Sequence, residues 1–137
     1  MYPVEINYLA AFVAALCVFA LGALWYGPLF GKAWLASQTV SAEDLKAGSG
    51  SMARTFGLSL AAYLVMALTL GMFVFLINPP DLSRGLWLAA VLCVGFALPG
   101  TLTSVLYSTN KMTLFWINGG YQLASFLLMG TVLTLWR

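Results

Sequence analysis

Four long stretches without a charged residue constrain this chain more than any other feature. The 137-residue sequence carries six Lys or Arg and four Asp or Glu, and the charge-free gaps between them are about 25 residues each. The gaps run between Glu5 and Lys32, Arg54 and Asp81, Arg84 and Lys111, and Lys111 and Arg137. A helix needs about 20 apolar residues to cross a hydrocarbon core of about 30 Å. The gaps therefore predict transmembrane spans over residues 6–26, 55–77, 85–107 and 114–136.

The composition supports an integral membrane protein. Hydrophobic residues make up 62% of the chain and charged residues 7%, whereas a soluble domain is about a quarter charged. A soluble helical bundle would also need polar outer faces, and the four apolar runs offer none. We therefore expect a single all-α domain over residues 1–137, made of four transmembrane helices in two hairpins. Glu5 stands where a signal peptide would carry positive charge, so we expect the first span to be retained.

The connections between the predicted spans have their own signals. Gly27 and Pro28 end the first span, and residues 29–35 are apolar but too short to cross. They predict a short interfacial helix with Lys32 toward the lipid head groups. Further on, Ser41 and Asp44 have the spacing of a helix cap. Asn78–Asp81 contains two prolines, which predicts a tight turn and a close hairpin between the second and third helices.

The distribution of basic residues predicts the orientation. Lys32, Lys46, Arg54 and Lys111 fall on the side of the first and third loops, and Arg84 and Arg137 on the other. Because positive residues favour the cytoplasm, we expect both termini outside. Aromatic residues near the predicted span edges are expected to anchor the helices at the membrane interfaces: Tyr2, Tyr8, Trp25, Tyr26, Trp34, Trp87, Tyr107, Trp116 and Trp136.

Polar residues inside the third and fourth spans are the candidate functional residues. In the third span Pro99 and Gly100 interrupt the helix, and hydroxyls follow at Thr101, Thr103 and Ser104. In the fourth span Asn118, Gln122 and Ser125 share one helical face, which should point at the third helix or at another subunit. Two interpretations stay open: a polar path along a broken helix, or an ordinary kink with small and polar residues that pack the helices together.

Catalytic and cofactor sites are not predicted. Histidine is absent, and two thiols, Cys17 and Cys93, do not make a four-ligand zinc site. Glu43 and Asp44 fit the start of a loop helix, while Ser104 and Cys93 have no base in sight. We therefore expect no enzyme activity, metal or cofactor, and the net charge of +2 gives no reason to expect a nucleic-acid partner.

Two pairs of short segments suggest an internal duplication. Leu16–Leu21 is similar to Leu92–Leu98 with one residue inserted, and Tyr63–Met66 is similar to Phe126–Met129. Both pairs relate the first predicted hairpin to the second in the same orientation. A true repeat would place a pseudo-two-fold axis along the membrane normal.

Two motifs resemble a known family. The stretch 22–34 contains Trp25, Tyr26, Gly27, Pro28, Phe30, Gly31, Lys32 and Trp34, and the stretch 117–123 contains Asn118, Gly120 and Tyr121. Together with residues 41–46, 129–130 and 136, they are similar to the bacterial membrane family "domain of unknown function 1761" over nearly the whole chain. The family commonly has serine at the place of Gly27 and histidine at the place of Gln122. The resemblance implies four spans in a bacterial inner membrane and no particular activity.

Two functional hypotheses follow. The first is a homo-oligomeric channel or transporter for a small solute, with the path between protomers because four such helices enclose little space. The second is an accessory or assembly subunit that binds a larger membrane protein through small-residue faces, at Gly57 and Ala61 and at Gly119 and Gly120. In both hypotheses the lipid bilayer is the main surrounding.

Overall fold

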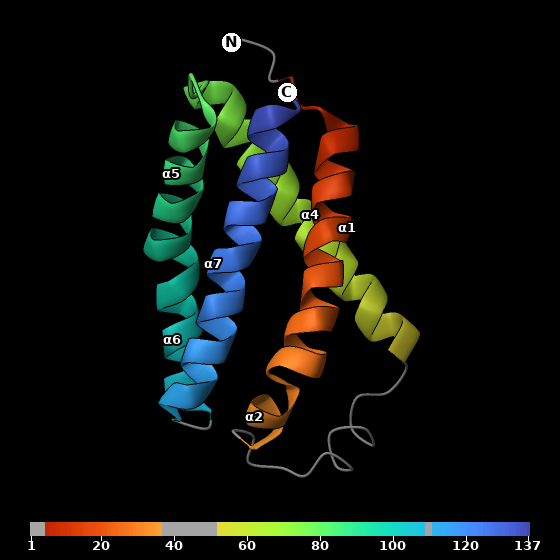
Figure 1. Cartoon of the computed structure of the whole chain (residues 1–137), viewed down its shortest axis with the longest axis vertical. Helices are drawn as coiled ribbons and strands as arrows, with labels where there is room; N and C mark the ends of the chain where they lie inside the picture. The colour runs from red at the N-terminus through yellow and green to blue at the C-terminus, as the bar shows by residue number, and fades with distance from the viewer. Residues whose placement is uncertain (1–4, 37–51, 109–110) are drawn as a thin grey trace.

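The computed structural model describes residues 5–36, 52–108 and 111–137, and every regular element in these ranges is a helix (Figure 1). In order they are α1 (Tyr8–Leu24), the π-helical turn η1 (Trp25–Leu29), α2 (Gly31–Ala36), α4 (Met52–Ile77), α5 (Leu82–Leu92), the π-helical turn η2 (Cys93–Ala97), α6 (Leu98–Tyr107) and α7 (Met112–Leu135). They form four long segments: α1–η1, α4, α5–η2–α6 and α7. The segment bounds differ from the predicted spans by at most three residues.

Three of the four segments are long and apolar enough to cross a membrane: Tyr8–Leu29, Ala53–Ile77 and Leu82–Tyr107. The fourth, α7, has 24 residues but is more polar, because it carries Asn118 and Gln122. Many large apolar side chains are exposed on the surface of the bundle, as expected for helices surrounded by lipid. The structure thus indicates a multi-pass membrane protein.

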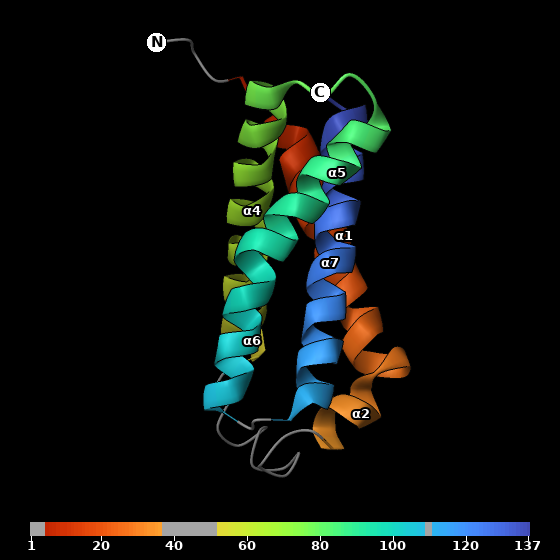
Figure 2. The same ribbon diagram turned by 90° about the vertical axis from the view of Figure 1, so that its left-hand side faces the viewer.

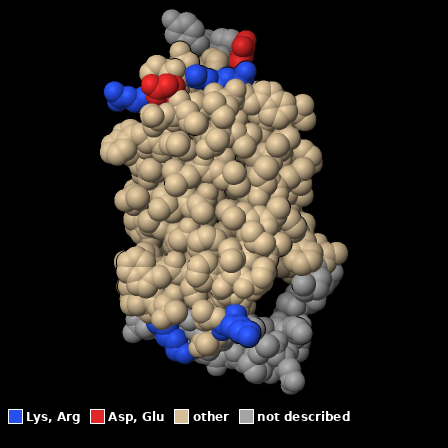
Figure 3. Space-filling view, in the orientation of Figure 1, with Lys and Arg blue, Asp and Glu red and all other residues tan. Residues whose placement is uncertain are grey.

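Charged side chains gather at the two ends of the bundle, with a broad uncharged band between them on the face shown in Figure 3. We call the end with residue 5, the turn 78–81 and residue 137 the terminus end. The other end, with α2 and the starts of α4 and α7, is the loop end (Figure 1). This arrangement is what the charge-free gaps predict.

The terminus end is fixed by specific hydrogen bonds. Asn7 caps α1 by accepting from the Ala10 amide at 3.0 Å, and Asp81 caps α5 by accepting from the Arg84 amide at 2.9 Å. Asn78 ends α4 with φ 51°, a left-handed conformation that asparagine tolerates. The Arg137 guanidinium donates to Asn78 Oδ1 at 3.0 Å and to the Pro79 carbonyl at 2.8 Å. The predicted turn at 78–81 is confirmed.

The central helix is α7, which packs against α1, α4 and α5–η2–α6. Beyond their turn, α4 and α5 have few contacts with each other, whereas both contact α7. The predicted close hairpin of the second and third segments is therefore wrong past the turn, because each of them packs on α7. A two-fold repeat would require α4 to contact α5 as α7 contacts α1, and these contacts are unequal. The internal duplication stays a prediction.

Both prolines of the long segments are accommodated by wide turns. Pro28 lies inside η1, and Pro99 follows η2 by two residues, at the start of α6. Near Pro99, the Thr101 hydroxyl donates to the Ala97 carbonyl at 3.0 Å, and the Thr103 hydroxyl donates to the Pro99 carbonyl at 2.9 Å. The third segment continues as a helix to Tyr107, so the predicted interruption is a widened turn. Both hydroxyls bond the carbonyl four residues earlier in their own helix.

The predicted interfacial helix corresponds to α2, which begins at Gly31 because Leu29 still belongs to η1. Its last carbonyl, that of Ala36, accepts from Lys111 Nζ at 3.4 Å, which ties α2 to the start of α7. The capped helix predicted around Ser41 lies outside the described residues.

Candidate functional site

An open cavity of about 860 Å³ lies in the loop-end half of the bundle, between α4, η2–α6 and α7. Hydroxyl, amide and aromatic side chains dominate its wall. Its lining consists of Tyr26, Trp34, Thr55, Phe56, Ser59, Tyr63, Met66, Ala97, Gly100, Thr101, Ser104, Val105, Asn118, Tyr121, Gln122 and Ser125. None of these residues is charged. The volume is in the range of small-molecule sites.

The two sequence motifs meet beside this cavity, although the paired residues are 92 positions apart. The Trp25 indole nitrogen donates to the Ile117 carbonyl at 3.0 Å. The Tyr26 hydroxyl donates to Asn118 Oδ1 at 2.7 Å. Both distances are those of ordinary hydrogen bonds, and the two bonds hold η1 against the loop-end half of α7. The motifs thus build one wall of the site.

Tyr121 is the aromatic centre of the site. Its hydroxyl donates to the Val18 carbonyl on α1 at 2.8 Å. Its ring meets those of Tyr26 and Tyr63 edge-on, with centroids 5.3 and 6.3 Å apart, the arrangement that aromatic quadrupoles favour. A Cβ on Gly22 would lie 2.8 Å from the Tyr121 hydroxyl. Gly22 therefore leaves the room that lets Tyr121 reach α1.

At two glycines of the motifs, a larger side chain would meet a neighbouring atom. A Cβ at Gly120 would lie 3.1 Å from Trp25 Cζ2, and a Cβ at Gly31 would lie 2.7 Å from the Tyr26 carbonyl oxygen. Both positions thus admit the close approach of the first segment. By contrast Gly27, Pro28 and Lys32 are not among the lining residues, and Gly27 has open space around it. Phe30 stacks on Trp25 with ring centroids 4.7 Å apart.

Unused hydrogen-bonding groups face the cavity from α7. Ser125 is 1% exposed, and its hydroxyl has no partner among the described residues. Asn118 accepts from Tyr26 through Oδ1, which leaves its two amide N–H donors for other partners. Gln122 Nε2 donates weakly to Thr101 Oγ1 at 3.4 Å. The predicted polar face of the fourth span thus lies toward the cavity: Gln122 reaches the third segment, and Asn118 reaches the first.

The structure divides the polar residues predicted in the third span. Gly100, Thr101 and Ser104 line the cavity, whereas Pro99 and Thr103 are exposed and do not. The division follows the helix period, since residues 100, 101 and 104 lie on one face. Pro99 acts through the shape of the segment.

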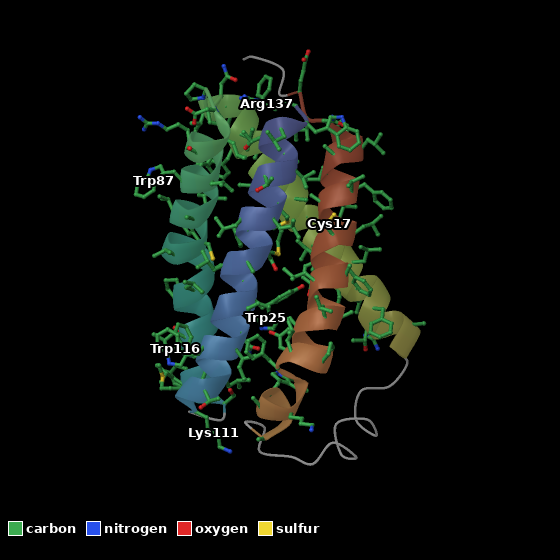
Figure 4. All side chains as sticks on the ribbon, viewed as in Figure 1. Cys17, Trp25, Trp87, Lys111, Trp116 and Arg137 are labelled. Carbon is green, nitrogen blue, oxygen red and sulfur yellow. The ribbon has the colours of Figure 1, made fainter. Side chains whose placement is uncertain are left out.

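The aromatic residues also divide. Trp87 and Trp116 are both 67% exposed and point outward near the two ends (Figure 4), as predicted for interfacial anchors. Trp25 and Tyr26 are partly buried and hydrogen-bond to α7, so they hold the site together, and their anchoring role stays a prediction. Trp34 packs edge-on against Tyr26, with centroids 5.9 Å apart. Proximity to a span edge places an aromatic at a membrane depth and does not say which face of the helix carries it.

One wall of the site was absent from the sequence-based candidates. Thr55, Ser59 and Tyr63 of α4 all line the cavity. Their spacing of four residues puts them on one face of an otherwise apolar helix, and this signal could have identified them.

The two small-residue faces that were predicted to bind a partner protein differ in exposure. Gly119 and Gly120 pack inside the bundle, with Leu98 and Trp25 respectively as neighbours. Only Gly57, together with the exposed Ala61, faces outward with open space beside it. In the described ranges, no cluster of His, Cys, Asp and Glu side chains suits a metal ion.

Comparison with known proteins identifies the family but no activity. The family described as "protein of unknown function (DUF1761)" matches residues 9–134. The searches of curated proteins and of solved structures each gave no match. The chain belongs to this family, and the match covers both motifs and every lining residue of the cavity.

Proposed function

We propose that this chain is a four-span protein of the bacterial inner membrane whose loop-end cavity admits an uncharged polar group, as the inlet of a small-solute channel or transporter. The loop end faces the cytoplasm, both termini lie outside, and no catalytic step is involved. The observation that carries the proposal is a cavity of about 860 Å³ whose wall is rich in hydroxyl and amide side chains and has no charged residue.

The polar character of α7 is consistent with a fourth span. It is the central helix, with Ile117, Tyr121, Ser125 and Met129 buried among the other segments. Polar side chains of transmembrane helices face the protein interior, because lipid cannot bond to them. Asn118 and Gln122 therefore lower the hydropathy of α7 without exposing polar groups to hydrocarbon.

The lining chemistry favours an uncharged ligand. A charged solute in a low-dielectric site needs an opposite charge or several strong hydrogen bonds. The lining residues supply hydroxyls, amides and aromatic faces and no such charge. A hydroxyl-bearing or amide-bearing group would find donors and acceptors there, including the amide N–H donors of Asn118.

The cavity is closed toward the terminus end. Val18, Ala67 and Met129 are fully buried, and Leu70 is 2% exposed, in a continuous apolar core. Passage therefore requires a second arrangement of the segments or a path completed by another copy. A homo-oligomer assembled through the exposed Gly57 and Ala61 face of α4 is part of this proposal, since small residues allow close helix contact.

Glycerol flux into proteoliposomes tests the proposal. Ser104→Leu would fill the cavity wall, so we expect slower glycerol entry than with the native protein. Thr103→Leu is the matched control, because Thr103 is next to Ser104 in the chain but does not line the cavity. Equal flux for empty vesicles, native protein and both variants would contradict the proposal. A reporter enzyme fused after Arg137 tests the orientation, and cytoplasmic activity there would contradict it.

The exposed Gly57 and Ala61 face also leaves room for a second candidate, an accessory subunit that binds a larger membrane protein. Purification in mild detergent separates the two. A stoichiometric larger partner that Gly57→Leu releases would favour the accessory role.

A further inference from the structure

An apolar groove of about 360 Å³ continues the polar cavity toward the middle of the bundle. It is lined by Val65, Met66, Thr69, Leu70, Phe73, Leu92, Phe96 and Phe126, and it shares Met66 with the cavity. The hydroxyl of Thr69 donates to the Val65 carbonyl of its own helix at 2.8 Å. The groove therefore offers hydrocarbon surface and no free hydrogen-bonding group from a side chain.

Cavity and groove both lie along the seam between α4 and the third segment. These two segments scarcely touch one another. Figures 1 and 2 show α6 and the loop-end half of α4 in the layer behind α1 and α7, at opposite sides of it. Thr55 and Ser104, on the two sides of the seam, are exposed. The polar wall is thus open sideways, toward the bilayer, at the loop end of the seam.

The chemistry of the seam favours an amphiphile over a second helix. The cavity side of the seam carries hydroxyl and amide groups and the groove side carries hydrocarbon, and an apolar helix face would match only the groove. A small solute alone would fill the cavity and leave the adjoining groove empty. A molecule with a polar head and an alkyl chain fills both, and it meets a matching surface in each.

We propose that the cavity binds the uncharged, hydroxyl-bearing head group of a single-chain amphiphile, an inference that rests on the proposed function. The amphiphile enters from the bilayer between α4 and α6, and its alkyl chain lies in the groove. The chain adds little affinity, because leaving lipid for an apolar groove is nearly neutral. Affinity comes from the head group and its hydrogen bonds with the Asn118 amide. The chain decides the route of access.

Equilibrium binding of radiolabelled 1-oleoylglycerol to single copies in phosphatidylcholine nanodiscs tests this inference. We expect saturable binding, with oleate at least tenfold weaker because no lining residue compensates its charge. Asn118→Ala should weaken binding about threefold to tenfold, the effect of one ordinary hydrogen bond. Leu92→Trp fills the groove and should abolish binding. Val94→Trp is the matched control, since Val94 is exposed on the same segment and outside the groove.

The outcomes separate this inference from the proposed function. Glycerol flux that depends on Ser104, without saturable 1-oleoylglycerol binding, would overturn the amphiphile and leave the solute inlet standing. Equal effects of Leu92→Trp and Val94→Trp would also overturn it, because the chain would lie elsewhere. If single copies bind the probe and discs with two copies exclude it, the result would support the seam as the binding site. If two copies associate, and neither single nor paired copies bind the probe, the seam would be assigned to a second copy and the inference would be overturned. If the native protein shows neither glycerol flux nor 1-oleoylglycerol binding, both proposals are contradicted.

Discussion

The two halves of the bundle bring the same four segments together with different side chains. In the terminus-end half, small residues meet: Gly85 and Ala89 of α5 face Gly130 and Thr134 of α7, and a Cβ on Gly130 would lie 2.9 Å from that of Ala89. Ala10 and Ala14 of α1 are fully buried in the same half. In the loop-end half, the long side chains of Trp25, Tyr26 and Tyr121 bridge the segments through hydrogen bonds.

The difference shows how residue size sets the distance between membrane helices. Lipid gives no hydrophobic drive for helices to associate, so close packing of small residues holds them together. In the loop-end half, the hydrogen bonds of the aromatic side chains join the first segment to α7. There α4 and α6 scarcely touch, and a cavity of about 860 Å³ remains between them and α7. Close packing of small residues thus provides stability at one end, and the separation of α4 from α6 provides space at the other.

The largest expected effect is in the close-packed half. A Cβ at Gly85 would collide with Thr134, so Gly85→Ala should separate α5 from α7. Overpacking of this kind costs about 1–3 kcal/mol. We expect that loss in the free energy of unfolding, measured by SDS titration in mixed micelles.

Gly95→Ala is the control for Gly85→Ala. Gly95 lies on the same segment with nothing within 4 Å of its added Cβ, so its substitution should not lower stability. The double variant Gly85→Ala with Thr134→Gly should recover part of the loss. If both alanine variants destabilise equally, steric contact between α5 and α7 is not the cause.

The next effect is at the aromatic side chains that bridge the first segment and α7. Trp25→Phe removes the hydrogen bond to the Ile117 carbonyl and part of the ring surface against Gly120. We expect a loss of about 1–2 kcal/mol in the free energy of unfolding, together with slower glycerol flux because η1 loses its fixed position. Trp87→Phe, at an exposed anchor, is the control and should leave flux unchanged.

A smaller effect is expected for the hydrogen bond between Tyr26 and Asn118. Interhelical hydrogen bonds in membranes contribute about 0.6 kcal/mol on average. A double-mutant cycle with Tyr26→Phe and Asn118→Ala isolates the pair, and we expect a coupling energy of about that size. A coupling of zero would mean that the two side chains reach each other without stabilising the fold.

The smallest effect on stability is expected for Ser125, and it tests whether the Ser125 hydroxyl contributes to helix packing. Ser125 keeps a buried hydroxyl without a partner, and such a group costs free energy. Ser125→Ala should leave stability unchanged or raise it by about 0.5 kcal/mol, as measured by the same SDS titration. A clear loss of stability would show that the hydroxyl serves the packing of the helices.

The membrane fold was predictable because it depends on composition along the chain. The four charge-free gaps locate the four segments, and the caps explain where the helices begin beyond them: Asp81 accepts from the Arg84 amide, so α5 begins three residues before the predicted span. The loop-end helix α2 was also expected.

The site was only half predictable because it depends on which face of each helix points inward. Gly100, Thr101, Ser104, Asn118, Gln122 and Ser125 were candidates and line the cavity. Trp25 and Tyr26 were assigned to the membrane interface by their depth, and their partners on α7 lie 92 residues away in sequence. The polar face of α4 was hidden by the strongly apolar average of that helix.

The wide turn η2 fixes the rotational phase of everything after it. A π-helical turn holds one residue more than an α-helical turn, so η2 takes up one extra residue within a single turn. If Cys93–Ala97 wound as regular α-helix at the same chain length, everything after Leu98 would turn by about 100°. Thr101 and Ser104 would then leave the cavity wall. A chain with one residue fewer between Leu92 and Leu98 would need a regular α-helical turn there to keep the same face of α6 toward the cavity.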